Sequence, residues 1–300
     1  MGTLVSQRAY GITAAHALQR ASDEIARLER LWSAFRQDSE VSALAASAGR
    51  QPIDIEEDTL LLLAQAARYH AWMCGAFDIT VGPLLAVWRA AARRGALPSS
   101  SELARATHLV NGRDLRLGPE RRAMLERAGQ RLDLGAIGKG YAADRCIEVY
   151  RSAGLRHALV DLGGNVALLG SRQDGGPYRV GVQAPNLPRG QCVGTLEAAD
   201  CAIVSSGSYE RFFVIDGRRY SHVIDPRSGQ PIDNDLSSVT VLAESSTFAD
   251  ALSTACLVLG LERGFTLAET LGADALLIDR AGNLHFTGEM ADRFCALSSA

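Results

Sequence analysis

The stretch LDLGAIGKGYAADR, residues 132–145, places glycines 135, 138 and 140 between an apolar strand pattern and a helix pattern. Glycines let backbone N–H groups approach a ligand closely, and the N-terminus of the following helix attracts anions. Lys139, inside this stretch, is the single lysine of a chain that otherwise uses arginine. The pattern indicates either an anion-binding turn with one compact cation or a plain connection between a strand and a helix.

Two phosphate-binding motifs are excluded here. Walker A requires a glycine where Asp133 stands and Ser or Thr where Gly140 stands. The dinucleotide fingerprint G-x-G-x-x-G is also absent, because the glycines follow the spacing G-x-x-G-x-G. Neither motif therefore identifies this turn as a nucleotide-binding site.

The composition narrows the class of protein. The chain has 300 residues, of which 47% are apolar and 22% charged, which is typical of a globular protein with a sizeable core. A net charge of −3 does not indicate the basic surface that nucleic-acid binding requires, so we expect no nucleic-acid partner. Apolar runs fall short of the ~20 residues of a membrane span, so no transmembrane segment is expected. The six cysteines form no C-x-x-C pair and most lie in apolar surroundings, as small buried side chains of a reduced, cytoplasmic protein do.

Hydrophobic periodicity predicts helices over residues 12–35, 58–74, 139–153 and 247–260, and another that begins near Leu84. Residues 93–102 are interpreted as a loop. Short strands dominate from residue 107 onward, with turns at Gly163-Gly164 and Asp216-Gly217. This order predicts the α+β class rather than a strict βαβ alternation. We expect a single domain over residues 1–300, with subdomain boundaries left open.

The stretch SSGSYERFFVIDGRRYSHVIDPRSGQPI, residues 205–232, carries polar groups between strands. His222 stands two residues after Tyr220 and three before Asp225, where a D-P-x-S-G loop begins. Loops at strand ends often carry function, although a lone histidine is more often structural. His222 is thus a candidate for catalysis or for a structural role.

The stretch STFADALSTACLVLG, residues 246–260, places Asp250 and Thr254 on one helix face, with Ser253 beside them. One carboxylate and two hydroxyls make an all-oxygen set. Such a set suits Mg²⁺, which takes one or two carboxylates and completes its shell with water and substrate phosphate. A capped helix with a polar face explains the same pattern without a metal.

These stretches together resemble the ApbE family of FAD:protein FMN transferases. The resemblance extends over nearly the whole chain and is carried by segments in the family's order: MGT (1–3), LWSAFRQDSEVS (31–42), GAFDITVGPLLAVW (75–88), LDLGAIGKGYAADR (132–145), LVDLGGN (159–165), SSGSYERFF (205–213), YSHVIDPRSGQPI (220–232) and FADALSTACLVLG (248–260).

The resemblance implies packed α/β subdomains with mixed and antiparallel sheets and FAD bound between them. It implies a Mg²⁺-dependent enzyme that cleaves the FAD pyrophosphate and attaches FMN through a phosphodiester to a threonine hydroxyl of an acceptor flavoprotein, with release of AMP. A Mg²⁺-dependent FAD pyrophosphatase that yields free FMN and AMP is the first alternative. A non-catalytic FAD-binding protein and, by analogy of fold, a flavin oxidoreductase are further alternatives.

The family's functional positions carry over to this sequence. The resemblance places FAD contacts at Met1, Phe35, Ala76, Phe77, Asp78, Asp133, Lys139 and Ile224. It places metal ligands at Ala136 (through its backbone oxygen), Asp250, Ser253 and Thr254, of which Ser253 stands where some relatives carry Asp. His222 matches the histidine of the family's S-H-x-I-D-P motif, and either His222 or Asp225 is expected to take the proton of the threonine.

The expected location follows from the N-terminus. MGTLVSQRAYG shows no charged region followed by an apolar one, as a signal peptide would, and no lipobox. We therefore expect a cytoplasmic protein. Because many relatives are exported lipoproteins, an exported or membrane-anchored protein whose leader is missing from this sequence is the alternative.

Overall fold

The computed structural model describes residues 2–185, 187–209 and 211–297 and divides into two compact units. The first unit comprises Met1–Arg27, Lys139–Gly207 and Asp235–Ala300, and the second comprises Leu28–Gly138 and Ser208–Asn234. Each unit is thus built from segments that lie far apart in the sequence. The expectation of one domain over residues 1–300 stays a prediction.

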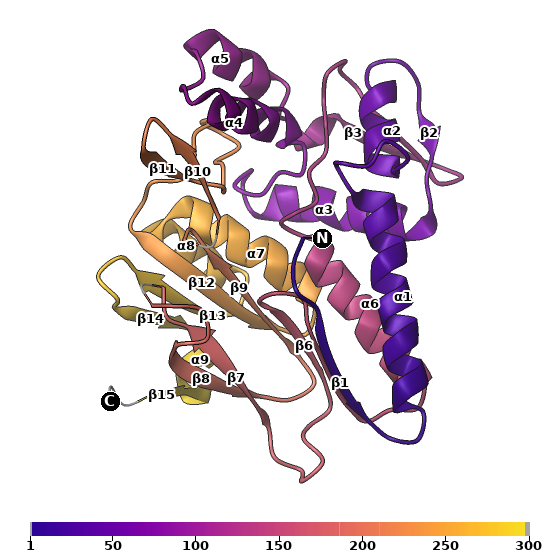
Figure 1. The fold of residues 1–300 in the computed structure, drawn as a ribbon, viewed down its shortest axis with the longest axis vertical. Helices are drawn as coiled ribbons and strands as arrows, with labels where there is room; N and C mark the ends of the chain where they lie inside the picture. Colours follow the sequence, from indigo (N-terminus) through magenta and orange to yellow (C-terminus); the bar gives the residue numbers. More distant parts are fainter. Residues whose placement is uncertain (1, 186, 210, 298–300) are drawn as a thin grey trace. The chain divides into compact units, whose positions relative to one another are not determined.

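The first unit is organised around a seven-stranded sheet (Figure 1) in which each neighbouring pair is antiparallel. The strand order is β1 (Ser6–Tyr10), β5 (His157–Asp161), β6 (Asn165–Leu169), β9 (Ala202–Gly207), β12 (Leu236–Ala243), β13 (Asp274–Asp279) and β14 (Leu284–Thr287). The first six residues of β12 are all buried, because this strand is covered on both faces. β12 therefore lies in the interior of the unit, between β9 and β13.

A smaller antiparallel sheet of the same unit has the order β15 (Phe294–Ala296), β8 (Cys192–Ala198) and β7 (Tyr178–Gln183). Its apolar side chains share a core with the large sheet and with the short helix α9 (Met290–Arg293). That core contains Leu168, Tyr178, Leu196, Ile203 and Met290. The two sheets of this unit are therefore joined by buried hydrophobic surface.

Besides α9, the helices of the first unit are the N-terminal part of α1 (Ala14–Trp32), α6 (Gly138–Ser152, from its second residue), α7 (Ser246–Leu259) and α8 (Leu261–Thr270). α7 packs against β9 and β12 and is buried along almost its whole length. An apolar helix such as this is stable because its neighbours cover it on all sides. Any polar side chain on α7 is consequently held in a fixed environment.

The second unit contains helices, a small sheet and a hairpin. Its elements are α2 (Glu40–Ser47), α3 (Glu57–Trp72), α4 (Gly82–Arg94), α5 (Ser100–His108), a 3₁₀ turn (Gly112–Asp114), the sheet β2 (Ile53–Asp54), β4 (Arg122–Leu125) and β3 (Leu115–Gly118), and the hairpin β10 (Phe212–Ile215) and β11 (Arg218–Ser221). The hairpin packs on α4, where the Trp88 ring lies 5.6 Å from the Tyr220 ring and 6.5 Å from the Phe213 ring.

The predicted α+β class is confirmed, and the predicted helix over 58–74 is observed as α3. The Asp216-Gly217 turn is also confirmed, with the two left-handed φ angles of 49° and 72° that a tight hairpin needs. The prediction of a loop over residues 93–102 is wrong at both ends, because α4 continues to Arg94 and α5 already includes residues 100–102. α5 begins at Ser100 because Ser99 and Glu102 form a reciprocal capping box.

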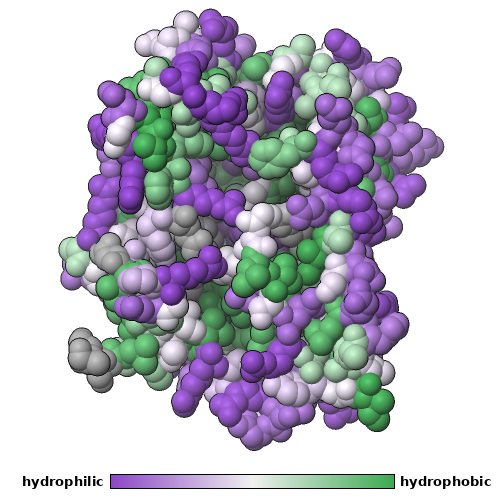
Figure 2. Space-filling model, in the orientation of Figure 1, coloured by the Kyte–Doolittle hydropathy of each residue, from purple (hydrophilic) through white to green (hydrophobic). Residues whose placement is uncertain are grey.

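The strand predicted to lead into the glycine turn is wrong as well. Residues 126–134 form no strand, and the β-pairing in this segment is a single bridge between Arg131 and Val81. None of the helices in the described part of the chain has the length and apolarity needed to cross a bilayer. On the face shown in Figure 2, hydrophobic residues form several separate areas among hydrophilic ones.

Candidate functional site

Two buried polar side chains of the first unit accept hydrogen bonds from the ammonium group of Lys139. Its Nζ donates to Asn165 Oδ1 at 2.6 Å and to Asp250 Oδ1 at 3.2 Å. Asn165 on β6 is fully buried and Asp250 on α7 is 1% exposed, whereas the Lys139 side chain keeps 25% of its surface exposed. Removal of the lysine would leave a buried carboxylate without its cation, which is costly. The single lysine of the chain is thus the counter-ion of Asp250.

Gly140 allows the start of α6 to approach the start of α7. Its N–H donates to Asp250 Oδ2 at 3.0 Å. A Cβ at this position would lie 2.3 Å from the Ser246 carbonyl oxygen and 2.8 Å from Thr247 Cα. Backbone atoms cannot move aside as a flexible side chain can, so only glycine fits here. The Asp250 carboxylate is thus held by two residues that are adjacent in the sequence, Lys139 and Gly140.

Asp144, one turn further along α6, caps the N-terminus of α7. Its carboxylate accepts hydrogen bonds from the Ser245 hydroxyl at 2.9 Å, the N–H groups of Ser246 and Thr247 at 2.8 and 2.9 Å, and the Thr247 hydroxyl at 2.6 Å. A carboxylate is favourable here because the N–H groups of the first helical turn lack partners within the helix. Asp144 and Gly140 together fix the position of α7 and of Asp250.

Hydroxyl oxygens lie next to Asp250 on α7. The Ser253 hydroxyl donates to the Asp250 carbonyl at 3.0 Å. Ser206 Oγ on β9 lies 2.9 Å from Ser253 Oγ and 3.3 Å from Thr254 Oγ1. Ser253 is fully buried and Thr254 is half-buried, so Thr254 is the more accessible residue of the two. This arrangement offers one carboxylate and three hydroxyls, a hard oxygen set.

Sequence reasoning did not select Asn165 or Ser206 as site residues, although both lie in stretches that it quoted. Asn165 Nδ2 is buried without a hydrogen-bond partner among the described residues. Groups of three or more His, Cys, Asp or Glu that could hold a metal are also absent from that part of the chain.

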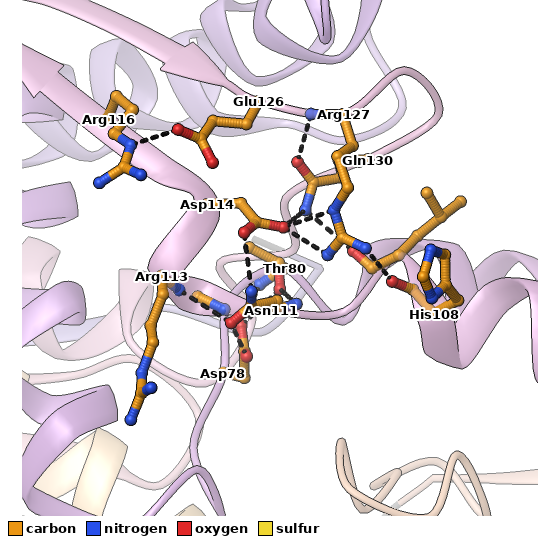
Figure 3. Close-up of polar contacts among 12 residues, drawn as sticks. Asp78, Thr80, His108, Asn111, Arg113, Asp114, Arg116, Glu126, Arg127 and Gln130 are labelled. Atoms are coloured by element: carbon orange, nitrogen blue, oxygen red, sulfur yellow. Dashed lines mark hydrogen bonds and ion pairs between the residues drawn. The ribbon is translucent and has the colours of Figure 1, made fainter.

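Asp78 is part of a polar network in the second unit (Figure 3). Its Oδ1 accepts from the N–H and the hydroxyl of Thr80 at 2.7 and 2.6 Å, and its Oδ2 accepts from the Gly112 N–H at 2.9 Å. The Thr80 hydroxyl in turn accepts from the Asn111 N–H at 2.9 Å. Ala76, Phe77 and Asp78 are all buried. The Asp78 carboxylate thus holds residues 78–80 against the loop at 111–112.

Asp133 and Phe35, two predicted FAD contacts, are connected by a residue that sequence reasoning missed. Asp133 donates its N–H to the Ile79 carbonyl at 2.7 Å and accepts from the Gly135 N–H at 2.9 Å. Arg89 Nη2 lies 3.4 Å from Asp133 Oδ2, and Arg89 Cζ lies 5.2 Å from the centre of the Phe35 ring. Ala136 follows in the turn before α6.

His222 directly follows β11, and its Nδ1 lies 2.9 Å from the Arg211 carbonyl oxygen. A carbonyl oxygen only accepts hydrogen bonds, so Nδ1 carries the proton of the neutral ring and Nε2 is the nitrogen that can take a proton. Asp225 accepts from Arg227 Nε at 2.8 Å and Nη2 at 2.9 Å, and this ion pair raises the pKa of Arg227. The Ile224 side chain is buried in the apolar core of this unit.

The structure thus brings together Lys139, Asp250, Ser253 and Thr254 in the first unit. In the second unit, Phe35 and Asp133 both contact Arg89. His222 and Asp225 lie in the loop that follows β11. Met1 lies outside the described residues. The roles expected for all of these residues stay predictions.

Comparison with known proteins defines the family. The sequence pattern of the ApbE family matches residues 1–277. The chain belongs to the ApbE family. Among the relatives of this ApbE chain, the FAD:protein FMN transferase of Treponema pallidum is 35% identical, with 100% of this chain and 88% of the relative aligned. The FAD:protein FMN transferase of Vibrio cholerae is 34% identical over 89% of this chain and 81% of its own.

Solved structures agree with this assignment. The flavin transferase ApbE from Vibrio cholerae superposes with a TM-score of 0.86 at 28% identity, over 98% of this chain and 96% of the other. The ApbE protein from Thermotoga maritima gives a TM-score of 0.88 at 28% identity, over 97% and 96% of the two chains. The family and the fold expected from the sequence are both confirmed.

Proposed function

We propose that this ApbE-family chain is a FAD:protein FMN transferase that cleaves the FAD pyrophosphate, attaches FMN to a threonine hydroxyl of an acceptor flavoprotein and releases AMP. The two relatives named above are called FAD:protein FMN transferases, which supports the transferase part of the proposal. The observation that carries the proposal is the buried Asp250 carboxylate, held by Lys139 and Gly140 beside three hydroxyls. A protein that only stored FAD would not need a buried carboxylate and a cation arranged in this way.

The cluster on α7 fits Mg²⁺ by the chemistry of its donors. Asp250 and Thr254 would hold the ion, with Ser253 and the backbone oxygen of Ala136 as the other protein ligands that the family pattern proposes. Mg²⁺ commonly takes one or two carboxylates and leaves the remaining positions to water and substrate phosphate. When bound, it would stabilise the negative charge that develops on the phosphate oxygens.

Lys139 supplies a positive charge that does not depend on the metal. Its side chain keeps part of its surface exposed although Asn165 and Asp250 fix the position of the ammonium group. A fixed cation stabilises charge that develops during phosphoryl transfer without reorganisation at the moment of reaction. We assign Lys139 to the phosphates of FAD. The segment 76–78 and Ile224 have buried side chains, so they would contact FAD through backbone groups.

His222 is the proposed general base. A threonine hydroxyl is a poor nucleophile until a base takes its proton, and an imidazole with a pKa near ~6.5 can do so at neutral pH. The hydrogen bond from Nδ1 to the Arg211 carbonyl directs this role to Nε2. The ion pair of Asp225 with Arg227 favours a structural role for Asp225 in the loop.

The proposed reaction balances as one substitution at phosphorus. The threonine oxygen forms a bond to the phosphorus of the FMN half, and the bond from that phosphorus to the bridging oxygen breaks. The proton of the hydroxyl passes to His222, and AMP leaves with the bridging oxygen. Met1, Phe35 and Asp133 complete the set of proposed FAD contacts.

The test is mass spectrometry of an acceptor domain with a candidate threonine after incubation with the protein, FAD and Mg²⁺. We expect the acceptor mass to rise by one FMN and AMP to appear. Asp250→Asn and His222→Gln should lose the transfer, whereas His16→Gln, at an exposed histidine of α1, should retain it. AMP and free FMN with an unmodified acceptor would instead indicate a pyrophosphatase, and intact FAD would indicate a binding protein.

A further inference from the structure

Phe35 is a large aromatic side chain that the fold leaves in solvent. It lies shortly after the end of α1 and is 81% exposed, whereas most phenylalanine side chains in globular proteins are largely buried. A single exposed apolar residue is not unusual by itself. Phe35 differs because a charged group from α4 lies over its ring.

That group is the guanidinium of Arg89 on α4, whose Cζ lies 5.2 Å from the centre of the Phe35 ring. The same guanidinium places Nη2 3.4 Å from Asp133 Oδ2. The other oxygen of Asp133 accepts the Gly135 N–H at 2.9 Å, so this carboxylate is held between the arginine and the glycine turn. Arg89 therefore contacts both of the residues at once.

The chemistry of the guanidinium explains why arginine suits this position. It is planar and presents several N–H donors along its edge, so it can stack on a ring while its edge contacts a carboxylate. An ammonium group has no planar face to stack. The Arg89 guanidinium lies over one side of the Phe35 ring, and the large exposed surface that remains on the ring is available to a flat ligand.

We propose that Arg89 is a positioning residue for FAD: it orients the Phe35 ring as a stacking surface for a flat ring of FAD and offsets the negative charge of Asp133, which would otherwise repel the anionic ligand. The inference rests on the proposed function, because it takes Phe35 and Asp133 as FAD contacts. Arg89 acts through these two residues, since preorganised contacts bind a ligand at a lower entropic cost.

The test measures the Kd of FAD by quenching of flavin fluorescence, with EDTA and without an acceptor, so that neither metal binding nor turnover enters. We expect Arg89→Met to weaken FAD binding by about two- to fivefold, the range of an exposed cation–π contact. Arg89→Lys should recover only part of the loss, because it keeps the charge but not the planar face. Arg93→Met, at an exposed arginine one turn along α4, is the matched control and should leave Kd unchanged.

A double-mutant cycle separates positioning from a general effect on the fold. If Arg89 acts through the ring, Arg89→Met should weaken binding much less in a Phe35→Leu background than in the wild type. Equal losses in both backgrounds, or an unchanged Kd for Arg89→Met, would overturn the inference while the proposed function stands. A wild-type chain that does not bind FAD would overturn the proposed function and this inference with it.

Discussion

Replacement of Gly140 by alanine tests how closely α6 and α7 must approach each other. The added Cβ would lie 2.3 Å from the Ser246 carbonyl oxygen, and real Cβ contacts essentially never fall under 3.0 Å. The two backbones would therefore have to separate by at least roughly 0.7 Å. The hydrogen bond from the Gly140 N–H to the Asp250 carboxylate would lengthen with them.

Three contributions set the size of the effect. Overpacking in a rigid interior costs about 1–3 kcal/mol. Loss of a hydrogen bond to a charged group costs about 1.5–3 kcal/mol. Alanine in place of glycine gains up to about 1 kcal/mol of helix propensity. We therefore expect Gly140→Ala to lower the free energy of unfolding by about 1.5–5 kcal/mol, which is the sum of the two costs minus a gain of about 1 kcal/mol in helix propensity.

The assay is urea-induced unfolding followed by far-UV circular dichroism. Gly138→Ala is the matched control, because a Cβ there would find its nearest neighbours, Leu134 Cβ and Trp32 Cε3, at an ordinary 3.8 Å. We expect its midpoint to stay close to that of the wild type. If Gly140→Ala unfolds at the same urea concentration as Gly138→Ala, the close approach of α6 to α7 does not determine the fold at this point.

Asp144→Ala should lower the free energy of unfolding by about 1.5–3 kcal/mol in the same assay, because the first turn of α7 loses its charged hydrogen-bond acceptor. Burial raises the pKa of Cys146 to about 12, so a thiol reagent at pH 8 should modify exposed Cys74 rapidly and Cys146 only after unfolding, as peptide mapping would show. The hydrogen bond from Arg94 lowers the pKa of Glu102 from 4.5 to about 2. The ionised Glu102 side chain therefore stabilises the folded protein fully above about pH 4.5, and this contribution is lost as the pH falls toward 2. The Tm difference between wild type and Glu102→Gln should shrink over that range, and a constant difference would contradict the assignment.

Local elements of the fold could be predicted because their signals are local. Apolar periodicity located α3, and the Asp216-Gly217 pair located the β10–β11 hairpin. The capping box of Ser99 and Glu102 was present in the sequence, but its serine-rich surroundings favoured a loop interpretation. The order of the strands could not be predicted, since β12 joins the sheet between β9 and β13 through long-range pairing.

The candidate site shows the same limit. Lys139 and Asp250 lie 111 residues apart, and only the resemblance to a family suggested that both serve one site. Nothing local in the sequence indicated that Asn165 would hold the lysine, or that Arg89 would bridge Phe35 and Asp133. Partners of this kind depend on which helices and strands become neighbours, and periodicity carries no such information.

The interleaved order of the two units has a consequence for synthesis on the ribosome. The seven-stranded sheet gains its interior strand, β12, only after residues 208–234 of the other unit have been translated. Because translation proceeds at about 5–20 residues per second, one edge of β9 stays unpaired for seconds. An unpaired edge is a template for pairing with other chains. We therefore expect nascent chains that stop before residue 236 to depend on chaperones, because β9 keeps this unpaired edge until β12 has been made.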